Sequence, residues 1–281
     1  MTIREIKSTI EDANALKAIT GAYTEVSALK LHKIRREVIT SRSFFVEILN
    51  LYALVRRISS KGVNAFRKLK SAEKSASIIL TSNNRFYGHI DTNLINFFLD
   101  SKGVNTLKTD VYLIGRGGIE ALHSRGFSHF ADFIFKSDVP EPQELIQLIS
   151  KIKNYTQVLI YFAQFETVMK QSPVVLDITQ SQAEALSQSF KAETMKDTFI
   201  FEPEAGKILD FFDSQLKQIL IGQTFLEAEL ARTGSRLIFM DQAQNNADEY
   251  LEQQQKLLSQ AKKSLQNTRI LEIVGGMIQK D

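Results

Sequence analysis

The chain has 281 residues, of which 43% are hydrophobic and 24% charged, and its formal net charge is +3. This length and composition are ordinary for a protein that buries a core, as one large domain or two small ones. There is no cysteine, which excludes disulfides, thiolate metal ligands and cysteine nucleophiles, and no dense Lys/Arg block with interleaved aromatic residues points to nucleic acid.

The first expected element is a helix over residues 2–60. Apolar residues recur there at steps of three or four, which is the spacing of one face of a helix. None of the four prolines lies before residue 140, so no proline breaks this stretch. The residues of the expected apolar stripe are Ile3, Ile6, Ile10, Ala13, Leu16, Ile19, Tyr23 and Val26.

Short apolar runs alternate with helical segments in the middle of the chain, residues 61–205. This alternation is typical of a Rossmann-like α/β domain with a mostly parallel sheet. Strands are expected at residues 77–81, 110–114, 157–162, 173–177 and 199–201, and helices at residues 91–98 and 142–152.

A glycine run, Gly115-Arg116-Gly117-Gly118, follows the second expected strand. A dinucleotide fingerprint needs a third glycine where Glu120 stands, so the run favours a tight turn from strand to helix. The four histidines form no H-E-x-x-H motif, and no phosphate-binding P-loop motif is present. The sequence therefore predicts no catalytic, cofactor-binding or metal-binding residue on this chain.

The last expected element is a helix over residues 206–278, which no proline interrupts. A helix of this length needs a partner for its apolar face, and the helix at the other end of the chain is the natural one. The predicted fold is therefore α/β, with a long antiparallel coiled coil of the N- and C-terminal helices (residues 1–60 and 206–281) and a central Rossmann-like globular domain (residues 61–205).

Several segments follow the motifs of one family in the right order. They are Ile19–Leu31, which fits I-T-x-A-x-x-x-V-x-A-x-K-L, and then Thr81–Gly88, Thr92–Leu94, Val111–Gly118, Val158–Pro173, Phe199–Pro203, and Glu272–Gly276, which reads E-I-V-G-G. By this ordered set, which covers almost the whole chain, the protein resembles the gamma subunit of F-type ATP synthases.

The resemblance implies a central-stalk rotor subunit. In the family, the tip of the coiled coil enters a ring of alternating alpha and beta subunits, and the globular domain holds an epsilon-like subunit and a membrane c-ring. ATP, ADP and Mg would then bind the partner subunits, which carry the catalysis, and this chain would be neither an enzyme nor a cofactor carrier. The expected partners also exclude nucleic acid.

The resemblance also implies two sets of contact residues. Along the shaft, the residues expected to contact the ring are Ile19, Ala22, Val26, Arg236, Met240, Asn246, Thr268, Ile270, Leu271, Ile273 and Val274. In the globular domain, the residues expected to face the base are Asn84, Arg85, Tyr87 and His89.

The N-terminus lacks the apolar core of a signal peptide, and no stretch approaches the ~20 apolar residues that span a bilayer. We therefore expect a cytoplasmic protein without direct membrane insertion, peripheral to the membrane through its complex.

The chain departs from the family at its most recognisable motif, because the family's T-S-D-R-G-L-C-G reads T-S-N-N-R-F-Y-G at residues 81–88. This keeps open the shaft of a divergent F-type-like ATPase that drives other machinery without an ion-conducting ring. A coiled-coil scaffold and a small α/β enzyme with a pocket at residues 115–118 are further alternatives. Likewise, Ile270, Leu271, Ile273 and Val274 either bear on the ring or pack on the N-terminal helix near Ile10 and Ala13.

Overall fold

The computed structural model describes residues 2–60, 74–101, 109–155, 157–178 and 205–278. The two long helices are α1, Ile3–Ser60, and α6, Ala205–Ile278, close to their expected bounds. A reciprocal pair of hydrogen bonds begins α1: the Thr2 backbone N–H donates to Glu5 Oε2, and the Glu5 N–H donates to Thr2 Oγ1. This is a capping box, which satisfies N–H groups that the first turn leaves unpaired.

The chain divides into two compact units, and each long helix contributes to both. One unit contains residues 1–28 and 236–281, and the other contains residues 29–235. The expected domain boundaries followed the ends of the long helices instead. The compact division differs because residues 29–60 of α1 and 205–235 of α6 share a core with the sheet.

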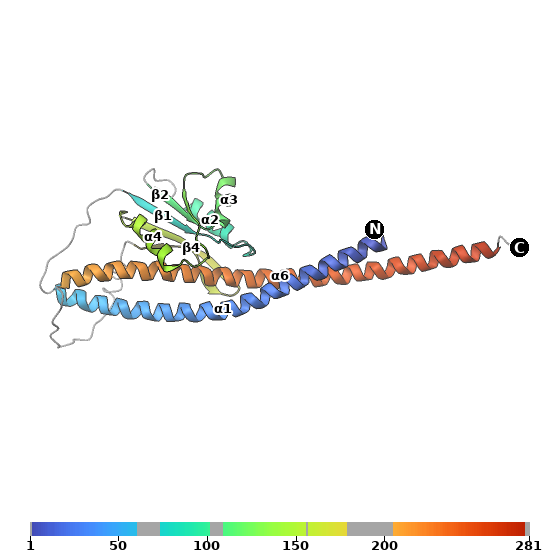
Figure 1. The fold of residues 1–281 in the computed structure, drawn as a ribbon, viewed down its shortest axis with the longest axis horizontal. Helices are drawn as coiled ribbons and strands as arrows, with labels where there is room; N and C mark the ends of the chain where they lie inside the picture. The colour runs from blue at the N-terminus through green and yellow to red at the C-terminus, as the bar shows by residue number, and fades with distance from the viewer. Residues whose placement is uncertain (1, 61–73, 102–108, 156, 179–204, 279–281) are drawn as a thin grey trace. The chain divides into compact units, whose positions relative to one another are not determined.

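The larger unit holds a five-stranded sheet in the order β3-β2-β1-β4-β5. Figure 1 labels β1, β2 and β4 of this sheet. Strands β1, β2, β3 and β4 are parallel neighbours, and only β5 is antiparallel to β4, which confirms the mostly parallel sheet. The strands are β1 Ser75–Leu80, β2 Thr109–Ile114, β3 Ala131–Phe133, β4 Gln157–Thr167 and β5 Lys170–Asp177.

Each face of the sheet packs against different helices. Ile78 and Leu80 of β1 belong to a core with α4 (Pro142–Ile152), α6 and α1, to which Phe45 and Phe225 contribute. Ile79, which points to the opposite face, packs in a second core with α2 (Ile90–Asp100) and α3 (Gly117–Ser124). The alternation follows from the two-residue period of a strand, and it places α6 directly on one face of the sheet.

In the smaller unit, α1 and α6 pair in antiparallel fashion. Lys17 Nζ lies 2.5 Å from Asp248 Oδ1, while Arg236 lies over the Tyr23 ring, so residue numbers rise on one helix as they fall on the other. The buried residues of α1 here recur at intervals of seven, the period of a coiled-coil seam. They are Ile6, Ala13, Thr20 and Ser27.

The seam differs from the expected apolar stripe. Leu16, Ile19 and Val26 are each more than half exposed, whereas Thr20 and Ser27 are buried. The hydroxyl of Thr20 donates to the backbone carbonyl of Leu16, so it does not need a partner on the other helix. Small side chains in the seam leave several large apolar side chains of α1 on the surface.

The sequence patterns did not predict β3. The glycine turn does lead from a strand into a helix, as expected, and that helix is α3. The strand expected at residues 199–201 lies outside the described residues. Within the described ranges, no helix combines the length and apolar character that a membrane span requires.

Candidate functional site

Most of the expected ring contacts in the smaller unit are on the surface of the paired helices. Ile19 and Val26 are 55% and 57% exposed, and Ala22 and Asn246 are exposed as well. Met240 is the exception: it is 4% exposed because it lies in the seam between the helices. Its side chain is therefore available for packing within the shaft and not for contact at the surface.

The end of α6 carries a group of exposed apolar side chains. Ile270, Leu271, Ile273 and Val274 are between 47% and 71% exposed, and Thr268 is exposed beside them. They do not pack on α1 near Ile10 and Ala13, which was the alternative interpretation. A helix end that leaves four large apolar side chains in water has the character of an interaction surface.

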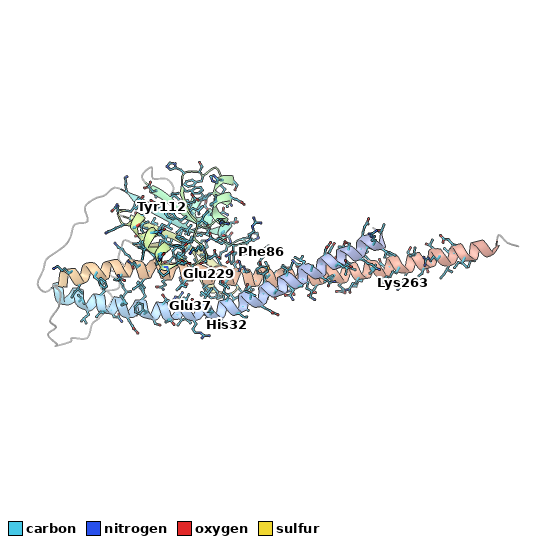
Figure 2. All side chains as sticks on the ribbon, viewed as in Figure 1. His32, Glu37, Phe86, Tyr112, Glu229 and Lys263 are labelled. Carbon is cyan, nitrogen blue, oxygen red and sulfur yellow. The ribbon has the colours of Figure 1, made fainter. Side chains whose placement is uncertain are left out.

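The loop after β1 carries the residues expected to face the base. Asn84, Arg85 and His89 are exposed, but Tyr87 is 4% exposed and turns inward. Phe86 between them has a φ of 69°, which is unusual for a bulky residue, and its ring is 52% exposed (Figure 2). Tyr87 thus holds the loop in place, and its neighbours form the surface.

The glycine turn after β2 is filled by the chain's own polar groups. The Gly117 N–H donates to the Ser82 carbonyl at 2.7 Å, and the Gly118 N–H donates to Thr81 Oγ1 at 3.1 Å. A methyl group at Gly117 would come within 2.6 Å of Asp91 Oδ2, so a carboxylate lies against the turn, whose N–H groups already donate within the chain. This supports a tight turn rather than a nucleotide site.

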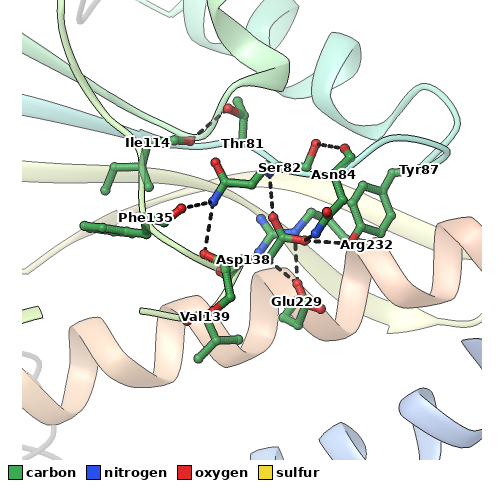
Figure 3. Close-up of polar contacts among 12 residues, drawn as sticks. Thr81, Ser82, Asn84, Tyr87, Ile114, Phe135, Asp138, Val139, Glu229 and Arg232 are labelled. Carbon is green, nitrogen blue, oxygen red and sulfur yellow. Dashed lines mark hydrogen bonds and ion pairs between the residues drawn. The ribbon is translucent and has the colours of Figure 1, made fainter. Parts of the chain in front are cut away.

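Arg232 of α6 is 2% exposed and lies where the sheet region meets the helices (Figure 3). Its Nη2 donates to the backbone carbonyl of Asp138 at 3.1 Å and to Glu229 Oε2 at 3.2 Å. Glu229, which is 1% exposed, also pairs with Lys30 of α1. A single buried guanidinium therefore connects α6 with the loop after β3, and Glu229 extends the connection to α1.

The side chain of Asp138 binds the loop after β1 through hydrogen bonds. Its carboxylate accepts hydrogen bonds from the Asn83 N–H at 2.5 Å, Asn84 Nδ2 at 2.8 Å and Tyr87 Oη at 2.6 Å. The Tyr87 carbonyl in turn accepts a hydrogen bond from Ser235 Oγ of α6 at 2.7 Å. We call the residues of this network the Arg232 cluster: Lys30, Tyr87, Asp138, Glu229, Arg232 and Ser235.

The charges of the cluster compensate one another. Burial raises the pKa of Asp138, but the Arg232 charge and the hydrogen bond from Tyr87 outweigh burial and hold the pKa below its usual value. Burial also opposes the charge on Arg232, yet Glu229, Asp138 and Asp91 keep its pKa above the ordinary value. For Asp91, burial dominates and raises the pKa, although Ser82 donates to its carboxylate.

A second ion pair joins the helices of the larger unit, because Arg42 Nε of α1 donates to Glu227 Oε1 of α6 at 2.5 Å.

The Arg232 cluster was not predicted from the sequence. One signal was available: Arg232 continues the spacing of Phe225 and Ala228, both buried, so it lies on the buried face of α6. No group of metal-ligating side chains occurs in the described ranges.

Comparisons with known proteins identify what this arrangement is similar to. The sequence profile of a family described as ATP synthase matches residues 2–278. ATP synthase gamma chains of Staphylococcus epidermidis and Desulfitobacterium hafniense are 23% and 25% identical, over 98% and 97% of both chains in each case.

Two solved structures share the fold. A chain of the Tetrahymena thermophila mitochondrial ATP synthase central stalk and c-ring aligns with a TM-score of 0.58 at 16% identity, covering 80% of this chain and 99% of that one. A chain of the Euglena gracilis mitochondrial ATP synthase aligns with a TM-score of 0.57 at 13% identity, covering 92% of this chain and 94% of that one.

Proposed function

This chain belongs to the ATP synthase family, and from that premise we propose that it is the central-stalk rotor subunit of an F-type rotary ATPase, passing torque between a catalytic ring and the base of the rotor. The observation that carries the proposal is the exposed apolar end of α6. Ile270, Leu271, Ile273 and Val274 lie on a helix that needs a surrounding partner to cover them.

The proposed role places the chemistry on other subunits. Nucleotide and Mg would bind alpha and beta subunits, and this chain would be non-catalytic and carry no cofactor. The glycine turn supports this assignment because its N–H groups, which would bind a phosphate, already donate to Ser82 and Thr81.

The proposed partners follow from the relatives. The alpha–beta ring would surround the paired helices at Ile19, Ala22, Val26, Arg236, Asn246 and the end of α6. An epsilon-like subunit and a c-ring would hold the globular domain near Asn84, Arg85 and His89. The protein would then be peripheral to a membrane through its complex, on the cytoplasmic side.

A native pull-down on this chain, with identification of the subunits and an ATPase assay, tests the proposal. We expect an active alpha–beta ring together with a c-ring. Recovery of an active ring with other proteins and no c-ring would instead identify the shaft of a repurposed motor. Recovery of neither, with self-association in light scattering, would contradict the rotor and favour a scaffold.

A further inference from the structure

Within the larger unit, the sheet region is held to α6 by two kinds of contact. One is the apolar core, in which Leu220 and Phe225 of α6 pack against the sheet. Apolar packing stabilises strongly but has little directional preference. The other is the Arg232 cluster, whose hydrogen bonds depend on distance and angle. Only the second kind fixes the rotational setting of α6 against the sheet through directed bonds.

The cluster forms a closed path that starts and ends on α6. Arg232 donates to the Asp138 carbonyl, the Asp138 carboxylate accepts from Tyr87 Oη, and the Tyr87 carbonyl accepts from Ser235. Residues 232 and 235 are three apart and share one face of the helix. The sheet region therefore has two attachments to a single helical turn, through loops that follow β1 and β3. Figure 3 shows Arg232 beside Asp138 at the first of them.

The same cluster includes α1, because Lys30 pairs with Glu229, the acceptor of Arg232. Both helices and the sheet region thus meet in one buried network. Arg232, Glu229, Asp138 and Tyr87 are each at most 6% exposed, so water does not compete for these bonds. Buried ionic networks of this kind are best attested as devices that fix register.

We propose that the Arg232 cluster is the rotational joint of the shaft: a set of positioning residues that fixes the angle of the α/β domain about α6 while torque passes between them. This inference rests on the proposed function, since only a rotor loads the joint in torsion. The apolar core supplies the adhesion, and the cluster supplies the angular stiffness.

The test uses a double substitution that removes two of the three hydrogen bonds of the closed path without changing charge, and leaves the bond from Arg232 to the Asp138 carbonyl in place. Tyr87→Phe removes the hydroxyl that donates to Asp138, and Ser235→Ala removes the donor to the Tyr87 carbonyl. A matched control makes the same chemical changes elsewhere in the domain. Tyr112→Phe removes the contact with Tyr155 Oη, and Ser101→Ala removes the bond to the Phe98 carbonyl, neither of which involves α6.

The readout is the angular spread of the domain in the full-length chain. Because the chain has no cysteine, cysteines introduced at the exposed positions Lys217 on α6 and His129 in the domain are the only sites for spin labels. We expect Y87F/S235A to widen the distance distribution between the labels by about twofold, since a network loses more than its separate bonds. S101A/Y112F should keep the wild-type width.

Two results would overturn the joint: an unchanged width in Y87F/S235A, or an equal widening in both double variants, which would indicate general loosening. A purely stabilising role would lower the melting temperature of the two double variants alike and leave both widths at the wild-type value. Rotation of a bead on His129→Cys in the ring complex is measured in parallel. A complex with His129→Cys as its only substitution in this chain that hydrolyses ATP without turning the bead would contradict the proposed function, while the label widths still decide the joint.

Discussion

Arg232 illustrates how a buried charge is retained at the scale of a single residue. A guanidinium that is 2% exposed loses its hydration, and here the Glu229 carboxylate and the peptide carbonyl of Asp138 replace the lost water. The stability of the site therefore depends on all partners being present together. Removing one of them leaves the others charged and buried.

Arg232→Met is expected to lower the free energy of unfolding by about 3–5 kcal/mol, because Glu229 and Asp138 lose their buried counter-charge. Urea denaturation followed by circular dichroism measures the change. Lys256→Met is the matched control: its pair with Glu252 is 69% and 68% exposed, so its loss should leave stability close to that of the wild type. Equal effects would show that burial does not govern these pairs.

Two carboxylates of the same site predict opposite pH dependence. The pKa of Asp91 is raised in the folded protein, so its contribution to stability is greatest below the unfolded value of about 3.9 and declines as pH rises through the folded value. The pKa of Asp138 is lowered, so its contribution is present above about 3.9 and is lost as pH falls through the folded value.

Urea unfolding of Asp91→Asn and Asp138→Asn across acid to neutral pH measures both contributions. Relative to Asp91→Asn, the wild type should lose stability as pH rises. Relative to Asp138→Asn, it should gain stability as pH rises. The same slope for both substitutions would rule out the opposed electrostatic environments of the two groups.

At the scale of elements, the turn between β2 and α3 is set by glycine. Gly115 has a φ of 99°, and an added methyl group would overlap the Thr81 carbonyl, whereas Gly126, with a φ of 77°, has open space around it. Both positions use the left-handed region that glycine tolerates. Only Gly115 also needs the absence of a side chain.

Gly126→Ala should therefore cost about 1–2 kcal/mol for the left-handed backbone alone. Gly115→Ala should cost clearly more, because β1 and the turn must separate to admit the methyl group. Thermal unfolding of the two variants provides the comparison. Similar melting temperatures would mean that the turn relaxes without penalty.

The elements also separate what the sequence could predict from what it could not. Both long helices follow from the lack of proline and the apolar period, and α4 begins and ends where expected, at Pro142 and Ile152. The seam through Thr20 and Ser27 did not follow, because the larger apolar residues beside it dominate the pattern. β3 did not follow because three residues carry no periodicity.

The Arg232 cluster was out of reach for a different reason. The sequence shows an arginine on the buried face of a helix, but its acceptor, the Asp138 carbonyl, lies 94 residues earlier in the chain. Burial of a charge becomes interpretable only with its partner in place. Tyr87 and Met240 were predicted to contact partners at the surface, but both side chains are buried. The reason is related, since a motif position does not reveal which way a side chain turns.

At the scale of the whole molecule, the proposed ring contact at the end of α6 can be removed without touching either core. A chain lacking residues 270–281 is expected to keep the fold of the larger unit, because none of the residues in its cores is deleted. It should lose co-purification with the alpha–beta ring, or coupling within it, because the four apolar contacts are gone. Pull-down with an ATPase assay measures both.

The control is a chain that lacks only residues 279–281, which retains Ile270, Leu271, Ile273 and Val274. It should assemble as the full-length protein does. Normal assembly and activity after the longer deletion would remove the apolar end of α6 from the proposed interface.

The shared core of α1 and α6 has a consequence for synthesis on the ribosome. Phe45 and Leu49 are made early, but Leu216 and Phe225, which pack in the same core, emerge only after the whole α/β domain. Chains fold from the N-terminus as they are made. The apolar face of α1 therefore stays partly uncovered until Leu216 and Phe225 have left the ribosome. A chain that terminates before Leu216 and Phe225 cannot complete this core, so the first helix depends on the last one for cover throughout synthesis.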